Sequence, residues 1–136
     1  MASKGEELIA KILTKSKIKF EQEKTFYDLK KGRYRYDFYI ENLDGRRVVI
    51  EFHGPQHSEL IKKFYSSERL WRAAMERDRT KISYCLANDI DIYIIPYWDQ
   101  PNLRRRADLF KDEYKAKTRW HTDEVRFSRE KQKQKI

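Results

Sequence analysis

Residues 33–53, RYRYDFYIENLDGRRVVIEFH, predict a β-hairpin at the centre of the fold. Polar and apolar side chains alternate through 33–41 and again through 46–53, as in strands that present two different faces. The intervening NLDG, at 42–45, is a turn sequence typical of hairpins. One strand face is expected to carry four large side chains: Tyr34, Tyr36, Phe38 and Ile40.

Helices and further strands are expected on both sides of this hairpin. Ahead of it lie an amphipathic helix over 4–16, which Ser3 caps, and a loosely alternating strand over 18–27. After it come a helix over about 66–88, a buried strand over 90–96, a helix from Pro101, and a frayed end over 126–136. The order α-β-β-β-α-β-α predicts an α/β fold, with a small mixed β-sheet flanked by helices.

Composition favours one basic, globular domain. The 136 residues carry a formal charge of +9, from 31 Lys and Arg against 22 Asp and Glu, which indicates a polyanionic partner such as nucleic acid. We expect a core over 1–100 and a basic helix and tail over 101–136, which belong to the same domain or are frayed. No segment is long and apolar enough to span a membrane, and Glu6 and Glu7 argue against a secretory signal, so a cytoplasmic location is expected.

Two carboxylates of the hairpin are candidates for metal binding. Asp37 and Glu51 lie on adjacent strands, each out of phase with the most apolar face, so they are expected at neighbouring or diagonal positions. Two carboxylates that close repel unless a cation lies between them, and Mg²⁺ suits a site of few carboxylates, waters and phosphate oxygens. The alternative is an exposed sheet face, on which the two pair with Arg35 or Arg47.

Further polar residues are candidates for the same site. Asp78 falls on the apolar stripe 71-75-78-82-85 of the predicted helix, so its carboxylate is expected to be buried and to need a partner. The partner would belong to a catalytic site or, as the alternative, would be an arginine in a structural ion pair. Glu6 borders the apolar stripe of the first helix, and its alternative role is a capping box. His57 follows the Gly-Pro turn after Glu51, where a histidine could transfer protons.

These residues together resemble a known pattern. Glu6 in a helix, Asp37 in a strand and Glu51 after a hairpin resemble the core of the PD-(D/E)XK restriction-endonuclease-like superfamily, with His53 where the usual lysine would stand. The segments IEFHGPQH (50–57) and MERDRTKISYCLANDIDIYIIPYW (75–98) look like those of very-short-patch-repair endonucleases. The order Glu, Asp, x, His, Asp is similar to that of EDxHD homing endonucleases and related phage nucleases. The resemblance covers about residues 3–98.

The resemblance implies a DNA endonuclease that uses Mg²⁺ or Mn²⁺. Asp37 would be the principal metal ligand, helped by Glu51 and more weakly by Glu6, and His57 would be the general base that Asp78 orients. His53 and Gln56 would support them. Six basic side chains would hold phosphates: Arg77, Arg79, Lys81, Arg104, Arg105 and Arg106. The single cysteine, Cys85, cannot supply the zinc ligands of the repair enzymes, so no structural zinc is expected and mismatch repair is disfavoured.

Partners and alternatives follow from this reading. The substrate would be double-stranded or branched DNA, double-strand cleavage would imply a homodimer, and the setting would be a bacterial cell or its phage. One alternative is a nucleic-acid-binding module without catalysis, for which Tyr34, Tyr36 and Tyr39 would be suitable. Another is a zinc-dependent binding module, which chelators would unfold.

Overall fold

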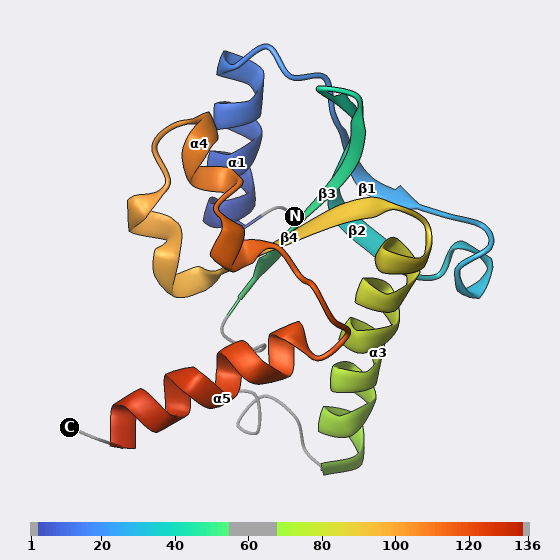
Figure 1. Ribbon diagram of the computed structural model, residues 1–136, viewed down its shortest axis with the longest axis vertical. Helices are drawn as coiled ribbons and strands as arrows, with labels where there is room; N and C mark the ends of the chain where they lie inside the picture. The colour runs from blue at the N-terminus through green and yellow to red at the C-terminus, as the bar shows by residue number, and fades with distance from the viewer. Residues whose placement is uncertain (1–2, 55–67, 135–136) are drawn as a thin grey trace.

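The computed structural model describes residues 3–54 and 68–134, and within them it is a mixed α/β fold (Figure 1). The strands are β1 (Glu21–Thr25), β2 (Arg35–Leu43), β3 (Arg46–His53) and β4 (Ile90–Pro96). The longer helices are α1 (Lys4–Lys15), α3 (Glu68–Ala87) and α5 (His121–Gln134). Short helical turns are η1 (Lys30–Gly32), η3 (Tyr97–Asn102), α4 (Arg106–Leu109) and η4 (Asp112–Tyr114). No helix in the described ranges has the length and apolar character needed to cross a membrane.

The four strands form one sheet in the order β1-β2-β3-β4. The first two pairings are antiparallel, and β3 pairs with β4 in parallel, so the sheet is mixed as predicted. A parallel pair needs a crossover, and α3 supplies it. The predicted bounds of β3 and β4 are confirmed, whereas β1 is shorter than the predicted 18–27.

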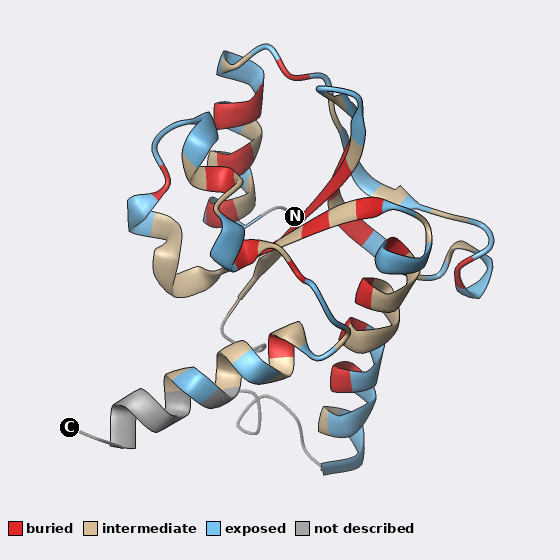
Figure 2. Ribbon diagram, viewed as in Figure 1, coloured by how far each residue is buried: buried red, intermediate tan, exposed pale blue. Residues whose placement is uncertain are grey.

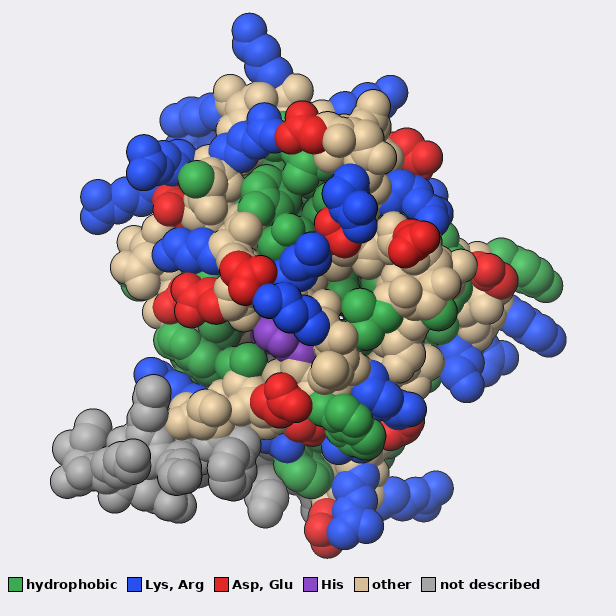
Figure 3. Space-filling view, viewed as in Figure 1, with side chains coloured by type: hydrophobic (Ala, Val, Ile, Leu, Met, Phe, Trp, Pro, Cys, Tyr) green, Lys and Arg blue, Asp and Glu red, His purple; other side chains and the backbone are tan. Residues whose placement is uncertain are grey.

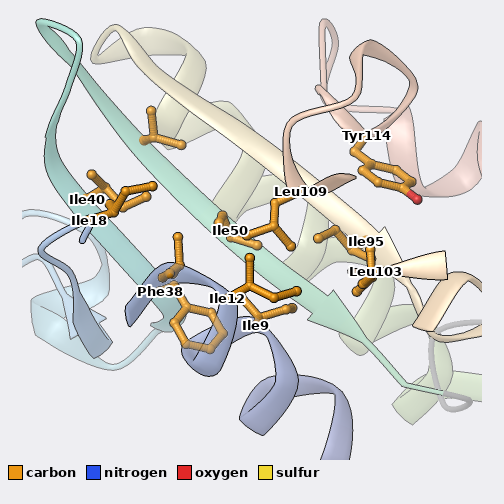
Figure 4. Close-up of a cluster of buried hydrophobic side chains, with 12 residues drawn as sticks. Ile9, Ile12, Ile18, Phe38, Ile40, Ile50, Ile95, Leu103, Leu109 and Tyr114 are labelled. Carbon is orange, nitrogen blue, oxygen red and sulfur yellow. The ribbon is translucent and has the colours of Figure 1, made fainter. Parts of the chain in front are cut away.

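One hydrophobic cluster lies between the sheet and α1 (Figure 4). The backbone N–H of Glu6 donates to the Ser3 hydroxyl at 3.2 Å and so caps the helix, as predicted. Ile9, Ile12 and Leu13 then pack against alternate residues of the central strands. The strand residues of this cluster are Phe38, Ile40, Val48, Ile50 and Ile95. The buried residues of α1 lie along the side of the helix that faces the sheet (Figure 2).

A second cluster lies on the other face, under α3. Its members from α3 are Ile82 and Cys85, and its members from the sheet are Tyr36, Tyr39, Val49, Ile90, Ile92 and Ile94. Tyr36 was predicted to share a face with Phe38, but the structure places it in this second cluster, and Tyr34 packs there too. The prediction is wrong because strand pairing is irregular next to Asp37: the β2–β3 ladder ends at Phe38–Ile50, and Glu23 of β1, between the partners of Tyr36 and Phe38, has a left-handed backbone (φ 53°).

The C-terminal segment differs most from the sequence prediction. Instead of one helix from Pro101, the chain makes η3, α4 and η4, from which Leu103, Leu109 and Tyr114 enter the first cluster. The residues expected to fray are helical to Gln134, within α5. Arginines dock this helix: Arg79 donates to both carboxylate oxygens of Asp123 (3.0 and 3.1 Å), and Arg126 lies 4.8 Å from the ring centre of Trp71. Because these contacts are made by charged side chains, the sequence of α5 shows no apolar stripe from which its docking could be predicted.

Candidate active site

Asp37 and Glu51 meet where β2 and β3 separate. The regular antiparallel ladder ends at the pair Phe38–Ile50, one residue before them. There, the Asp37 carboxylate accepts a hydrogen bond from the backbone N–H of Phe52 (2.8 Å), and the Glu51 carboxylate accepts one from the backbone N–H of Asp37 (3.2 Å). Each carboxylate is therefore held by the backbone of the opposite strand. The predicted proximity of the two is confirmed.

The electrostatics of this pair favour a bound cation. Burial, followed by the neighbouring Glu51 charge, raises the pKa of Asp37 to about 9. Glu6 contributes to that rise, and its own pKa is raised first by burial and then by the charges of Glu51 and Glu23. The three carboxylates that the sequence proposed as metal ligands thus lie close enough to repel one another. A cation between them would relieve that repulsion.

Lys81 reaches this site from α3. Its ammonium forms an ion pair with Glu51 and donates to the backbone carbonyl of Arg35. It also lies 4.9 Å from the ring centre of Tyr36, whose hydroxyl donates to the Lys81 carbonyl at 2.8 Å. From the sequence, Lys81 is expected among the phosphate contacts of the helix surface. The structure places it against a carboxylate that is only 4% exposed.

A small pocket beside Glu51 brings further candidates together. Glu51, His53, Asp78 and Lys81 line it, together with isoleucines from α3 and β4. Asp78 is 7% exposed, so the carboxylate in the apolar stripe does point inward. His57 and Gln56 lie outside the described residues. The histidine that the structure places at the same pocket as Asp78 is His53.

The six predicted phosphate contacts do not form one surface. Arg77 is exposed on α3. Arg79 instead forms hydrogen bonds with Asp123 and Glu76, and so helps to hold α5 against α3. Arg106 pairs with Asp44 in the hairpin turn (3.1 Å). That turn lies about 17 Å from Glu51, by the rise of the five residues from the start of β3. Arg104 and Arg105, which precede α4, are exposed near that same end.

His121 is a candidate that sequence reasoning missed. Its helix, α5, was expected to fray, yet His121, Thr122 and Arg126 line a pocket together with His53 and Gly54. Burial lowers the pKa of His121, which favours a neutral imidazole at pH 7. The sequence offers little to identify His121 as a site residue, apart from the fact that the chain has only three histidines.

The ligand chemistry at Asp37 and Glu51 fits Mg²⁺ or Mn²⁺. Among the described residues, no group of three or more His, Cys, Asp and Glu side chains is arranged to hold a metal ion. Mg²⁺ commonly binds through one or two carboxylates, and waters and substrate phosphates complete its shell. Buried Glu51 and half-buried Asp37, two mutually repelling carboxylates, meet that need.

Gly5 sets the distance between α1 and the site. A Cβ added at Gly5 would lie 2.2 Å from Cζ of Phe52, the residue after Glu51. We expect Gly5→Ala to destabilise the fold by about 1–3 kcal/mol, because α1 must move away from β3. Helix propensity alone predicts the opposite sign, a gain of up to about 1 kcal/mol.

Urea unfolding of Gly5→Ala measures this effect. Lys11→Ala, at an exposed position of the same helix, is the control and should stay near the wild type. A Gly5→Ala variant as stable as the wild type would mean that the helix and strand can separate without cost.

The raised pKa of Asp37 predicts how the stability of the metal-free protein depends on pH. Asp37 keeps its proton in the folded state up to about pH 9, whereas the unfolded chain releases it near pH 4. The contribution of Asp37 to stability is therefore present at low pH and is lost as pH rises through that window, by at most about 1.4 kcal/mol per pH unit. Unfolding in EDTA from pH 5 to 9 should show a steeper decline for the wild type than for Asp37→Asn. Parallel curves would contradict the assignment.

Comparison of this chain with protein-family models, with curated proteins and with solved structures finds no match in any of the three. A functional conclusion must therefore rest on the geometry and chemistry of the site itself.

Proposed function

We propose that this chain hydrolyses phosphodiester bonds in DNA, with Mg²⁺ or Mn²⁺ held by Asp37 and Glu51. The observation that carries the proposal is a pair of carboxylates, buried Glu51 and half-buried Asp37, cross-bonded between two separating strands and faced by Lys81. A structural ion pair needs one carboxylate for one lysine, and a second carboxylate with a raised pKa adds cost without adding stability. Costly groups of this kind concentrate at functional sites.

The roles of the side chains follow from their positions. The metal ion supplies a positive charge that polarises the phosphate and lowers the pKa of water. Asp37 and Glu51 would hold it, and Glu6 is close enough to orient water near it. Lys81 would hold a non-bridging phosphate oxygen when its pairing with Glu51 loosens.

A histidine of the segment 53–57 would accept the proton of the attacking water. His57 is the residue that the motif order supports, and His53 is the described residue at the pocket of Asp78. In both cases Asp78 would orient the ring and favour its charged form. Cleavage by His53→Gln and by His57→Gln identifies the proton acceptor, because the variant that loses more activity lacks it.

The restriction-endonuclease-like core belongs to the same proposal. A helix bearing Glu6 packs on a mixed sheet whose second and third strands bear Asp37 and Glu51, and this arrangement supports the resemblance drawn from the sequence. Duplex or branched DNA is the proposed substrate, and a homodimer is the assembly that cutting both strands would imply. Exposed basic residues alone would also suit the alternative, a nucleic-acid-binding module without catalysis.

Incubation with supercoiled plasmid tests the proposal. We expect nicked or linear DNA with Mg²⁺ or Mn²⁺ and intact plasmid in EDTA. Glu51→Gln should lose the activity, whereas Asp44→Asn, an exposed carboxylate in the turn of the same hairpin, should retain it. Nicked product alone would favour a monomer. No cleavage with either metal, or equal cleavage by Glu51→Gln, would overturn the proposal and favour the binding module.

A further inference from the structure

The loop between β1 and β2, residues 26–34, projects from the sheet at the end where Asp37 lies (Figure 1). The last pair of the β1–β2 ladder is Thr25–Arg35, and Asp37 follows two residues later. The carbonyl of Arg35 accepts the hydrogen bond from Lys81, so the base of the loop is joined to the candidate site. By strand rise, Tyr34 at the end of the loop lies about 10 Å from Asp37.

Internal contacts hold the loop firmly. Phe26 packs against the rings of Tyr36, Tyr39 and Tyr84, with ring centres 5.8, 5.4 and 5.2 Å away. Leu29 is buried in the same cluster. The hydroxyl of Tyr84, on α3, donates to Asp28 at 2.6 Å. Residues on either side of position 27 are therefore fixed by the core and by α3.

Tyr27, between these anchors, points away from the protein. Its side chain is 79% exposed, although tyrosines are usually at least partly covered. Three cations are exposed on the same loop: Lys30, Lys31 and Arg33. Within the described residues none of them forms an ion pair. By contrast, Lys24 and Arg35, which flank the loop, form ion pairs with Glu21 and Glu23 respectively. Lys and Arg side chains stand out at this edge of the molecule (Figure 3).

The backbone of the loop is strained next to these cations. Lys30 and Lys31 both have left-handed backbone conformations, with φ of 50° and 54°, and Gly32 follows at 77°. Two consecutive non-glycine residues in that region are costly and persist where the surroundings hold them. The strained turn places two exposed lysines three and four residues after the exposed Tyr27.

We propose that the loop of residues 26–34 binds a nucleic-acid strand beside the candidate site, with Tyr27 stacked on an unpaired base and Lys30, Lys31 and Arg33 on its phosphates. The inference rests on the proposed function for the class of its ligand. A polyanion with flat rings matches a loop that carries three exposed cations and one exposed ring. The base must be unpaired, because the faces of bases inside a duplex are covered by their neighbours. Of the proposed substrates, the loop therefore favours branched DNA, which has a single-stranded segment next to the cut.

Fluorescence anisotropy in EDTA tests binding apart from cleavage. The probes are a labelled duplex with a single-stranded overhang and a blunt duplex of the same sequence. We expect Tyr27→Ala to weaken binding to the overhang DNA by roughly 5- to 100-fold and to change blunt-duplex binding less than about twofold, while Tyr27→Phe stays near the wild type. The Lys30→Ala/Lys31→Ala variant should weaken both and lower the slope of log K against log salt by about 0.7–0.9 per lost phosphate contact.

A matched pair of exposed lysines on α1 provides the control. Lys11→Ala/Lys15→Ala removes the same charge on the outer surface of that helix and should bind like the wild type. The inference is overturned if Tyr27→Ala binds the overhang DNA within twofold of the wild type, or if its loss is equal on both probes. It is also overturned if the loop lysines behave like the control pair. Failure of the nuclease proposal would instead appear as an uncut plasmid, with these binding differences intact.

Discussion

Asp37→Asn is expected to abolish metal-dependent cleavage, while the metal-free variant matches the stability of the wild type near pH 4 and exceeds it at pH 7. Without metal, Asp37 is protonated at that pH, because burial and Glu51 raise its pKa to about 9. The asparagine amide has nearly the same shape as the neutral acid. Its oxygen can accept the N–H of Phe52, and its amide nitrogen can donate to Glu51 where the carboxyl proton did.

Cleavage should respond very differently from stability. The amide carries no charge and cannot become a carboxylate when Mg²⁺ arrives, so the principal proposed ligand is lost. We expect a fall in rate of roughly 10³-fold, the scale seen when a group that stabilises transition-state charge is removed. Plasmid nicking and urea unfolding in EDTA, on the same preparations, measure the two effects.

The combination of results is what discriminates between roles. Asp44→Asn serves as the control, because it makes the same chemical change at an exposed position of the hairpin turn. Wild-type cleavage by Asp37→Asn would move the site elsewhere. Loss of cleavage with a loss of about 2 kcal/mol or more in stability would assign Asp37 a structural role instead.

The hairpin and its two carboxylates could be predicted because the information is local. The turn at 42–45 brings 33–41 against 46–53, within one residue of the register that the structure shows after a shift between Ile40 and Leu43. The α1 helix was predictable for the same reason, since Ser3 and the apolar stripe lie within a few residues of one another. Nothing distant in the chain had to be known.

The contributions of α3 and α5 could not be predicted from local pattern. Lys81 has the composition of a surface residue, and its burial follows from Glu51, which is 30 residues earlier in the chain. Tyr36 lies on the face opposite to Phe38 because strand pairing is irregular next to Asp37, and the regular alternation of the sequence does not reveal that irregularity. The α5 helix docks through Arg79 and Arg126, which look like solvated charges in a sequence.

Lys81→Met is expected to produce the largest loss of stability of any single change at the site, about 3–5 kcal/mol in EDTA at pH 7. The lysine ammonium is the ion-pair partner of Glu51, and both side chains are largely buried. Methionine fills a similar space but leaves Glu51 as an uncompensated charge beside Asp37. Exposed pairs such as Arg72–Glu68 are worth less than about 1 kcal/mol, so removal of Arg72 is the matched control.

Two further measurements show whether the site is built for a cation. In the double variant Lys81→Met/Glu51→Gln the uncompensated charge is gone, so most of the lost stability should return. The difference between the stability change of the double variant and the sum of the two single changes measures the coupling of Lys81 with Glu51. Mg²⁺ should restore Lys81→Met more than it stabilises the wild type, because the ion takes the place that the ammonium left at Glu51. It should do little for the double variant, which lacks the carboxylate. If Mg²⁺ leaves Lys81→Met as unstable as EDTA does, then Glu51 and Asp37 do not bind a metal ion, and their pairing with Lys81 is structural.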